Sequence, residues 1–136
     1  FNEEVEIVKN TTSNINNSVS EVLSSSEILK IQNLIRQIPV ADNVVEYAVK
    51  LVAKTRPDSD FAPEDVKKYL SWGAGPRASQ FLVLAAKCHA AINGKYSPDI
   101  EDVKAISYPV LRHRIVRNYK AEAEGMSVEK LIHSLL

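Results

Sequence analysis

The chain of 136 residues contains few of the features that mark disulfide-rich, β-sheet or membrane proteins. Its single cysteine, Cys88, allows no internal disulfide, as is usual for proteins of a reducing compartment, and we expect a cytoplasmic location. With four glycines and few runs that alternate apolar and polar residues, the sequence argues against a β-fold. No stretch approaches the 18 or so apolar residues that a membrane span needs.

Net charge is also absent, since 17 basic residues balance 17 acidic ones. Nucleic-acid-binding proteins usually carry a basic excess, so we expect no nucleic-acid partner.

The three histidines lie far apart and form no metal-ligand spacing, so we predict no metal site. The only Gly-Lys pair, Gly94-Lys95, has His89 where a phosphate-binding loop of the G-x-x-x-x-G-K-[ST] type needs glycine.

Apolar residues recur instead at helical spacing. Hydrophobic residues make up 45% of the chain, which is enough for the core of one domain. Stripes with 3-4 spacing run over 28–38, 44–52, 66–70 and 128–135, whereas 81–92 is apolar over most of its circumference, which is typical of a helix in the middle of a bundle. We count five clear helices and two doubtful ones, and predict an all-α bundle of about five to seven helices with 76–92 at its centre.

Turn and capping signals separate these helices. Asn2–Lys9 is short and polar, and a helix is one interpretation of it. Thr11 to Ser20 is rich in Ser, Thr and Asn, which is typical of a loop or flexible connector. Ser24 and Glu27 have the spacing of a capping box. Further along, Ser97-Pro98 is expected to start a helix and Tyr108-Pro109 to interrupt one.

The run from Gly73 to Ser79, Gly-Ala-Gly-Pro-Arg-Ala-Ser, opens the most apolar helix. Gly75 suits the N-cap, and Pro76 suits the first helical position because its missing N–H would be unpaired there. Helix N-termini attract anions, and Arg77 adds a planar donor group suited to phosphate oxygens. From the residues alone, two interpretations stay open: a phosphate contact, or an ordinary helix start with a solvated arginine.

A local basic cluster follows in the second half of the chain, made by Arg112, His113, Arg114, Arg117 and Lys120. If this stretch is helical, Arg114 and Arg117 share a face. Such a face would bind phosphate or the acidic residues of a neighbouring domain or subunit, and the alternative is a solvated helix surface.

Three further side chains are expected in the core. Trp72 and Tyr69 precede the glycine run and should pack beneath it, since large aromatic residues are usually mostly buried. Cys88 should be a small buried residue of the central helix rather than a nucleophile, because no base is placed to activate it.

From Ile31 to Leu136 the chain resembles the C-terminal helical lid domain of MoxR-type AAA+ ATPases. The order and spacing of several short pieces carry this resemblance. The pieces are Tyr47 with Thr55-Arg56, the run 69–79, Ala85-Ala-Lys, the stretch 97–103, Val110-Leu-Arg-His-Arg-Ile, and Glu122-Ala-Glu-Gly.

The resemblance implies a role for the glycine run. In this family a Gly-Ala-Ser-Pro-Arg run carries the sensor 2 arginine, which contacts the γ-phosphate of ATP, and that catalytic role falls on Arg77. Gly73, Gly75 and Pro76 would form the rest of the nucleotide-binding run. Gly75 replaces the usual serine, and because glycine also caps helices well, the placement of Arg77 should survive.

The resemblance also implies a larger protein around this chain. Residues 1–25 would be a connector from an upstream AAA+ core domain, and 26–136 the lid. ATP and Mg²⁺ would bind the full-length protein, a chaperone-like machine that forms a homo-oligomeric ring and acts on an unknown client. Without Walker A and Walker B segments, this chain alone should be inactive. Arg112, Arg114 and Arg117 would contact the core.

The alternative function is a stand-alone helical adaptor that binds a protein partner without nucleotide.

Overall fold

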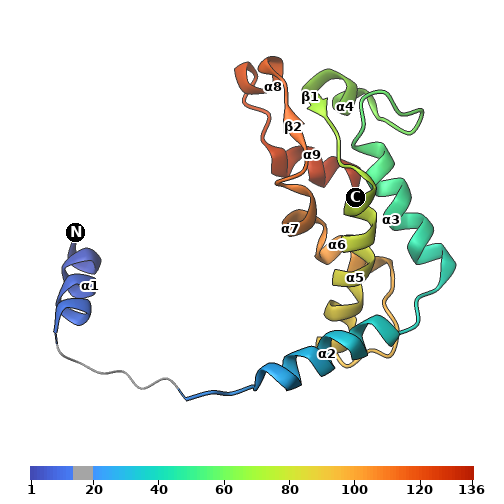
Figure 1. Cartoon of the computed structure of the whole chain (residues 1–136). Helices are drawn as coiled ribbons and strands as arrows, with labels where there is room; N and C mark the ends of the chain where they lie inside the picture. The colour runs from blue at the N-terminus through green and yellow to red at the C-terminus, as the bar shows by residue number, and fades with distance from the viewer. Residues whose placement is uncertain (14–19) are drawn as a thin grey trace. The chain divides into compact units, whose positions relative to one another are not determined.

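The computed structural model describes residues 1–13 and 20–136 and is mostly helical, which confirms the predicted all-α class (Figure 1). In order, the elements are α1 (Asn2–Thr12), α2 (Ser25–Gln37), α3 (Asp42–Lys54), α4 (Glu64–Tyr69), β1 (Leu70–Trp72), α5 (Pro76–Ile92), α6 (Ile100–Ala105), α7 (Ser107–Leu111), β2 (Val116–Arg117), α8 (Tyr119–Ala123) and α9 (Val128–Leu135). The chain divides into two compact units, Phe1–Lys30 and Ile31–Leu136.

The first unit contains α1 and the start of α2. Helix α1 confirms the helical interpretation of Asn2–Lys9 but continues to Thr12, into the predicted connector, and none of its residues is buried. Residues 14–19 of that connector lie outside the described part of the chain. The predicted capping box at α2 is confirmed, because the Ser24 N–H donates to the Glu27 carboxylate at 2.7 Å and the Glu27 N–H to the Ser24 hydroxyl at 3.3 Å.

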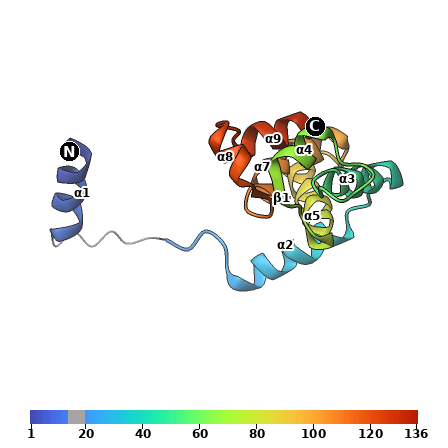
Figure 2. The same ribbon diagram turned by 90° about the horizontal axis from the view of Figure 1, so that it is seen from above.

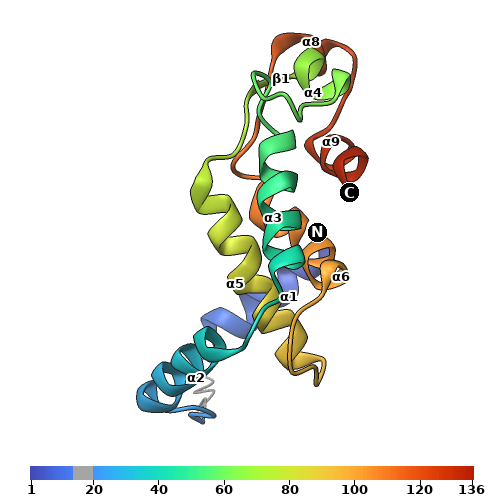
Figure 3. The ribbon, with the colours of Figure 1, turned by 90° about the vertical axis from the view of Figure 1, so that its right-hand side faces the viewer.

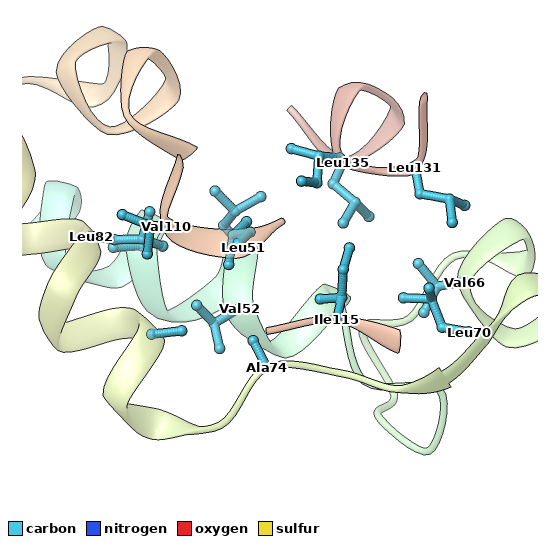
Figure 4. Close-up of a cluster of buried hydrophobic side chains, with 14 of the residues drawn as sticks. Leu51, Val52, Val66, Leu70, Ala74, Leu82, Val110, Ile115, Leu131 and Leu135 are labelled. Atoms are coloured by element: carbon cyan, nitrogen blue, oxygen red, sulfur yellow. The ribbon is translucent and has the colours of Figure 1, made fainter. Parts of the chain in front are cut away.

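The second unit is a helical bundle in which α5 is central, as predicted. Helix α5 packs on α3, α6 and α7, and Figures 1 and 3 both show α3 and α5 side by side. Its contact face repeats every four residues, with Ala78, Leu82, Ala86 and Ala90 all fully buried. Three of these four side chains are methyl groups, so neighbouring helices approach closely. Figure 4 shows Leu82 beside Leu51, Val52 and Val110 in this core.

The C-terminal half of the bundle closes the other end of the core. The stripe predicted on the last helix is confirmed, since Leu131, Ile132 and Leu135 of α9 are buried. Helix α4 packs against α8, as the view from above also shows (Figure 2). Tyr69 of α4 donates its hydroxyl to the Glu124 carboxylate just beyond α8 at 2.6 Å.

A two-stranded antiparallel sheet was not predicted. Strand β1 pairs with β2, with Leu70 opposite Arg117 and Trp72 opposite Val116. Strands of two and three residues are too short to show an alternating pattern in the sequence. Their effect is to tie the segment before the glycine run to the segment after α7.

Two predicted helix boundaries were wrong. Helix α6 begins at Ile100 rather than at Ser97-Pro98, because Asp99 is the N-cap. The Asp99 carboxylate accepts from the Asp102 N–H at 3.0 Å, and the Asp102 carboxylate accepts from the Asp99 N–H at 2.8 Å. Pro109 does not interrupt a helix, since it lies in the first turn of the short α7, where proline's missing N–H costs no hydrogen bond.

Asp102 is also the centre of a buried charge network at the far end of α5. Its carboxylate is fully buried and lies 2.7 Å from His89 Nδ1 and 3.1 Å from Lys95 Nζ. Burial alone would raise the pKa of Asp102, but the Asp99 N–H, the His89 ring and the Lys95 ammonium outweigh it and lower the pKa to about 2.

In the described segments, no helix has both the length and the hydropathy that a membrane crossing would require.

Candidate functional site

The N-terminus of α5 has the geometry that the glycine run predicts. Gly75 is the N-cap, with extended φ/ψ of −82° and 178°, and Pro76 opens the helix. The Ala78 N–H donates to the Gly75 carbonyl at 2.9 Å and closes the first turn. Ala78 is fully buried against the bundle, whereas Arg77 beside it is exposed and extends from the bundle surface.

The end of α3 holds this helix start in place. Thr55 is fully buried, and its hydroxyl donates to the Val52 carbonyl at 2.6 Å and accepts from the Ala74 N–H at 2.9 Å. The Arg56 Nε donates to the Ala74 carbonyl at 2.8 Å. Both backbone groups of Ala74 are therefore bonded to α3's C-terminal residues, which fixes the residue just before the N-cap.

Gly73 is required at its position because the backbone of α3's end lies against it. A Cβ atom built on Gly73 would lie 2.3 Å from the Thr55 carbonyl oxygen and 2.6 Å from the Arg56 Cα. These neighbours are backbone atoms and cannot move aside as a flexible side chain would. A Cβ on Gly75 meets nothing within 4 Å, so the serine usual in the related family would fit there.

Arg77 has the surroundings of an anion contact. Among the described residues, it makes no hydrogen bond within 3.5 Å and no ion pair within 4.0 Å. The first turn of α5 contains no acidic residue. The guanidinium and the unpaired N–H groups of the helix start are thus both available to one negatively charged ligand.

A hollow of about 530 Å³ opens beside this helix start. Residues 56–61 of the loop after α3 form one side, and residues 71–76 form the other. Trp72 and Phe61 both line it, and their side chains are 72% and 56% exposed. The prediction that Trp72 packs beneath the glycine run was wrong, because β1 turns its side chain outward. Tyr69 is buried as expected, at 6% exposure, but its hydroxyl bonds to Glu124 beyond α8, and its packing beneath the glycine run stays a prediction.

The basic cluster does not form one surface. Residues 112–117 leave the helix after Leu111 and enter β2, so the helix that would place Arg114 and Arg117 on one face does not form. Arg112 lies 3.9 Å from the Glu129 carboxylate, and Arg117 donates to the Met126 carbonyl at 2.9 Å. Arg114 instead lies over the Phe81 ring, with its guanidinium carbon 5.1 Å from the ring centroid.

Other sequence candidates differ from expectation in detail. Cys88 is half-buried rather than fully buried, because it lies on the face of α5 that points away from the fully buried stripe. Within residues 1–13 and 20–136, no group of three His, Cys, Asp or Glu side chains is arranged to hold a metal ion.

Sequence reasoning missed the anchor residues of the site. The sequence comparison with the family includes Thr55-Arg56, but the sequence gives no physical reason for these two residue types. The available signal was a polar pair, Thr55-Arg56, immediately after an apolar helix. Such a pair usually lies in a solvated loop, so it did not predict a buried anchor. Only the contact with Ala74 shows what the pair does.

Fold and site together define a helical bundle whose central helix presents an arginine at its exposed N-terminus. Residues 62–135 match the family model described as an AAA lid domain. This match covers more than half of the chain, and the chain belongs to the AAA lid domain family. It is the lid domain of a MoxR-like AAA ATPase, which supports the family interpretation over the stand-alone adaptor.

Two relatives support this assignment. The chain is 34% identical over 116 residues, 85% of its length, to Chaperone MoxR1 of Mycobacterium tuberculosis. A crystal structure of a candidate ATPase from Cytophaga hutchinsonii covers 98% of the chain with a TM-score of 0.83 and 32% identity. The chain spans 31% of the first relative and 41% of the second, so the matched region is one part of larger proteins.

Proposed function

We propose that Arg77 acts as the sensor 2 arginine of the parent ATPase and contacts the γ-phosphate of bound ATP. The observation that carries this proposal is the position of Arg77, exposed in the first turn of α5 and without an acidic partner in the described residues. Phosphoryl transfer is accelerated when positive charge lies where negative charge develops. A helix start whose preceding residue is bonded to the end of α3 would present such charge from a held backbone.

The surrounding residues would form the rest of the nucleotide contact. Gly75 and Pro76 begin the helix whose N–H groups face the ligand, and Gly73 lets the loop pass against α3. Because the loop is bonded to the end of α3, a force on Arg77 is transmitted to the bundle rather than absorbed by the loop. The lid would therefore move with the nucleotide state of the core.

The parent protein, on this proposal, is a chaperone-like machine that binds ATP with Mg²⁺ in an upstream AAA+ core. It would work as a homo-oligomeric ring on a client protein, and this chain alone would not hydrolyse ATP. Residues 1–25 would connect the core to the lid at 26–136. Arg112 and Arg117, which contact the Glu129 carboxylate and the Met126 carbonyl near the start of α9, would be the arginines that meet the core. Arg114 lies apart from them, over the Phe81 ring.

The test is ATP hydrolysis by the full-length parent with Arg77→Ala and Arg77→Lys. We expect Arg77→Ala to lower kcat by about 10²-fold or more, in the range found when one transition-state donor is lost. Arg77→Lys should recover only part of the rate, because lysine lacks the planar pair of donors. Gln80→Ala, exposed one turn further along α5, is the matched control and should leave kcat unchanged. An unaltered rate in Arg77→Ala would contradict the sensor role.

A further inference from the structure

An apolar groove runs along the face of α5 opposite its buried stripe. Its floor is made of Phe81, Leu84, Ala85 and Cys88, which are spaced i, i+3, i+4 and i+7 and therefore lie on one face. Phe81 is 46% exposed, and the other three are half-buried. Phe81 and Cys88 are seven positions apart, which makes this stripe about 10 Å long. We call this surface the α5 groove.

Helices on both sides form the walls of the α5 groove. Ile31 and Ile35 of α2 border it on one side, and Ile106 and Pro109 of the α6–α7 segment border it on the other. Three hollows of about 480, 420 and 370 Å³ follow one another along it, and Leu84 borders all three. The hollows are thus parts of one continuous apolar surface.

The rim of the α5 groove carries charge of one sign. Arg36, Lys87 and Arg114 line the hollows, and no aspartate or glutamate does so. None of the ion pairs found in residues 1–13 and 20–136 involves these three cations. In a chain with 17 acidic and 17 basic residues, a rim without a carboxylate marks a surface suited to a negatively charged partner.

The backbone of the walls limits how a partner binds. The groove lies between helices, whose N–H and C=O groups bond within each helix, so it offers no strand edge for an extended peptide. A partner must bind through side chains, and an apolar floor two helical turns long suits the i, i+3, i+4, i+7 face of another helix.

We propose that the α5 groove binds an amphipathic helix of another polypeptide whose apolar stripe is flanked by aspartate or glutamate. The stripe would lie on Leu84, between the α2 and α7 walls. Its acidic flanks would meet Arg36 and Lys87 on one side and Arg114 on the other. Arg114 already lies over Phe81, so an acidic side chain that pairs with it would also rest against the aromatic ring.

The test uses the full chain and a labelled 14-residue helical peptide with leucines at i, i+3, i+4 and i+7 and flanking glutamates. Fluorescence anisotropy measures its Kd and that of the same peptide with lysine in place of each glutamate. We expect the acidic peptide to bind about tenfold more tightly or better, with a difference that shrinks at high salt. Equal affinities would overturn the proposal. So would equal binding of a peptide with the same composition but dispersed leucines.

Variants of the chain locate the binding. Leu84→Glu places a charge on the floor and should abolish binding, with circular dichroism to confirm that the fold persists. The double variant Arg36→Glu/Arg114→Glu should reverse the preference toward the lysine peptide. Ile92→Glu, on the same helix but 85% exposed outside the groove, should bind as the original chain does. Unchanged binding in Leu84→Glu would contradict the proposal.

Sedimentation of the chain alone tests the competing occupant, a second copy. We expect a monomer at micromolar concentration, both with and without Leu84→Glu. A dimer that Leu84→Glu dissociates would show that the groove pairs with another copy of itself, and would overturn the proposal of an acidic helical partner.

Discussion

Thr55 and Ala74, nineteen residues apart, are joined by a hydrogen bond of 2.9 Å from the Ala74 N–H to the Thr55 hydroxyl. Both residues are buried, so no water can replace that bond. The bond joins the end of α3 to the residue before the N-cap of α5, and it sets where Arg77 is presented.

Thr55→Val is expected to destabilise the chain by about 1–3 kcal/mol. Valine has nearly the same shape, so the main change is a buried Ala74 N–H left without an acceptor. Urea unfolding followed by circular dichroism measures the loss. Thr55→Ser keeps the hydroxyl and should retain more of the stability than Thr55→Val. Equal losses in the two variants would show that shape, and not the hydrogen bond, matters at this position.

Gly73→Ala is expected to cost about 2 kcal/mol or more, because its Cβ would lie 2.3 Å from the Thr55 carbonyl oxygen. Thermal unfolding should show a lowered Tm. The control is Gly75→Ser, which introduces a side chain into open space and supplies a better N-cap, so its stability should be unchanged or slightly higher. If Gly73→Ala is as stable as the original, the close approach of the two backbones is not a constraint.

Arg77→Ala is expected to leave the stability of the isolated chain within about 0.5 kcal/mol of the original, as for other exposed residues without a structural partner. Chemical unfolding of the chain measures this directly. The same substitution slows hydrolysis in the parent if the sensor proposal holds, so the two measurements together separate a functional residue from a structural one. A large loss of stability would mean that Arg77 supports the fold.

Asp102 should make the free energy of unfolding of the chain depend on pH. The pKa of Asp102 is about 2 in the folded chain, against an ordinary value of 3.8, so the unfolded state binds its proton first as the pH falls. Its contribution of about 2 kcal/mol is therefore complete above pH 4 and is lost as the pH falls toward 2.

Unfolding curves of the original chain and Asp102→Asn between pH 2 and pH 7 measure this effect. Asp102→Asn should be less stable at pH 7, and the difference between the two proteins should narrow toward pH 2. Asp42→Asn replaces an exposed carboxylate and should reproduce the original curve. A difference between original and Asp102→Asn that stays constant over this range would show that the charge of Asp102 contributes nothing.

The bounds of α5, the stripe on α9 and the capping box at Ser24 and Glu27 were predictable from the sequence. All three depend on residues within about two helical turns of one another, where spacing and side-chain type decide the outcome. The start of α6 was missed within that range, because Ser97-Pro98 and Asp99 are both reasonable starts and only the reciprocal bonds of Asp102 decide between them.

By itself, the sequence determined the helical class, the central helix and the position of Arg77 in its first turn. The tertiary structure decided what lies around them. Pairing of β1 with β2 turned Trp72 outward, and Thr55 bonded to Ala74. The chain's turn after α7 separated Arg114 from Arg117 and placed it on Phe81. These contacts join segments far apart in the chain, and no local period or cap encodes which distant backbone group or aromatic ring a side chain will meet.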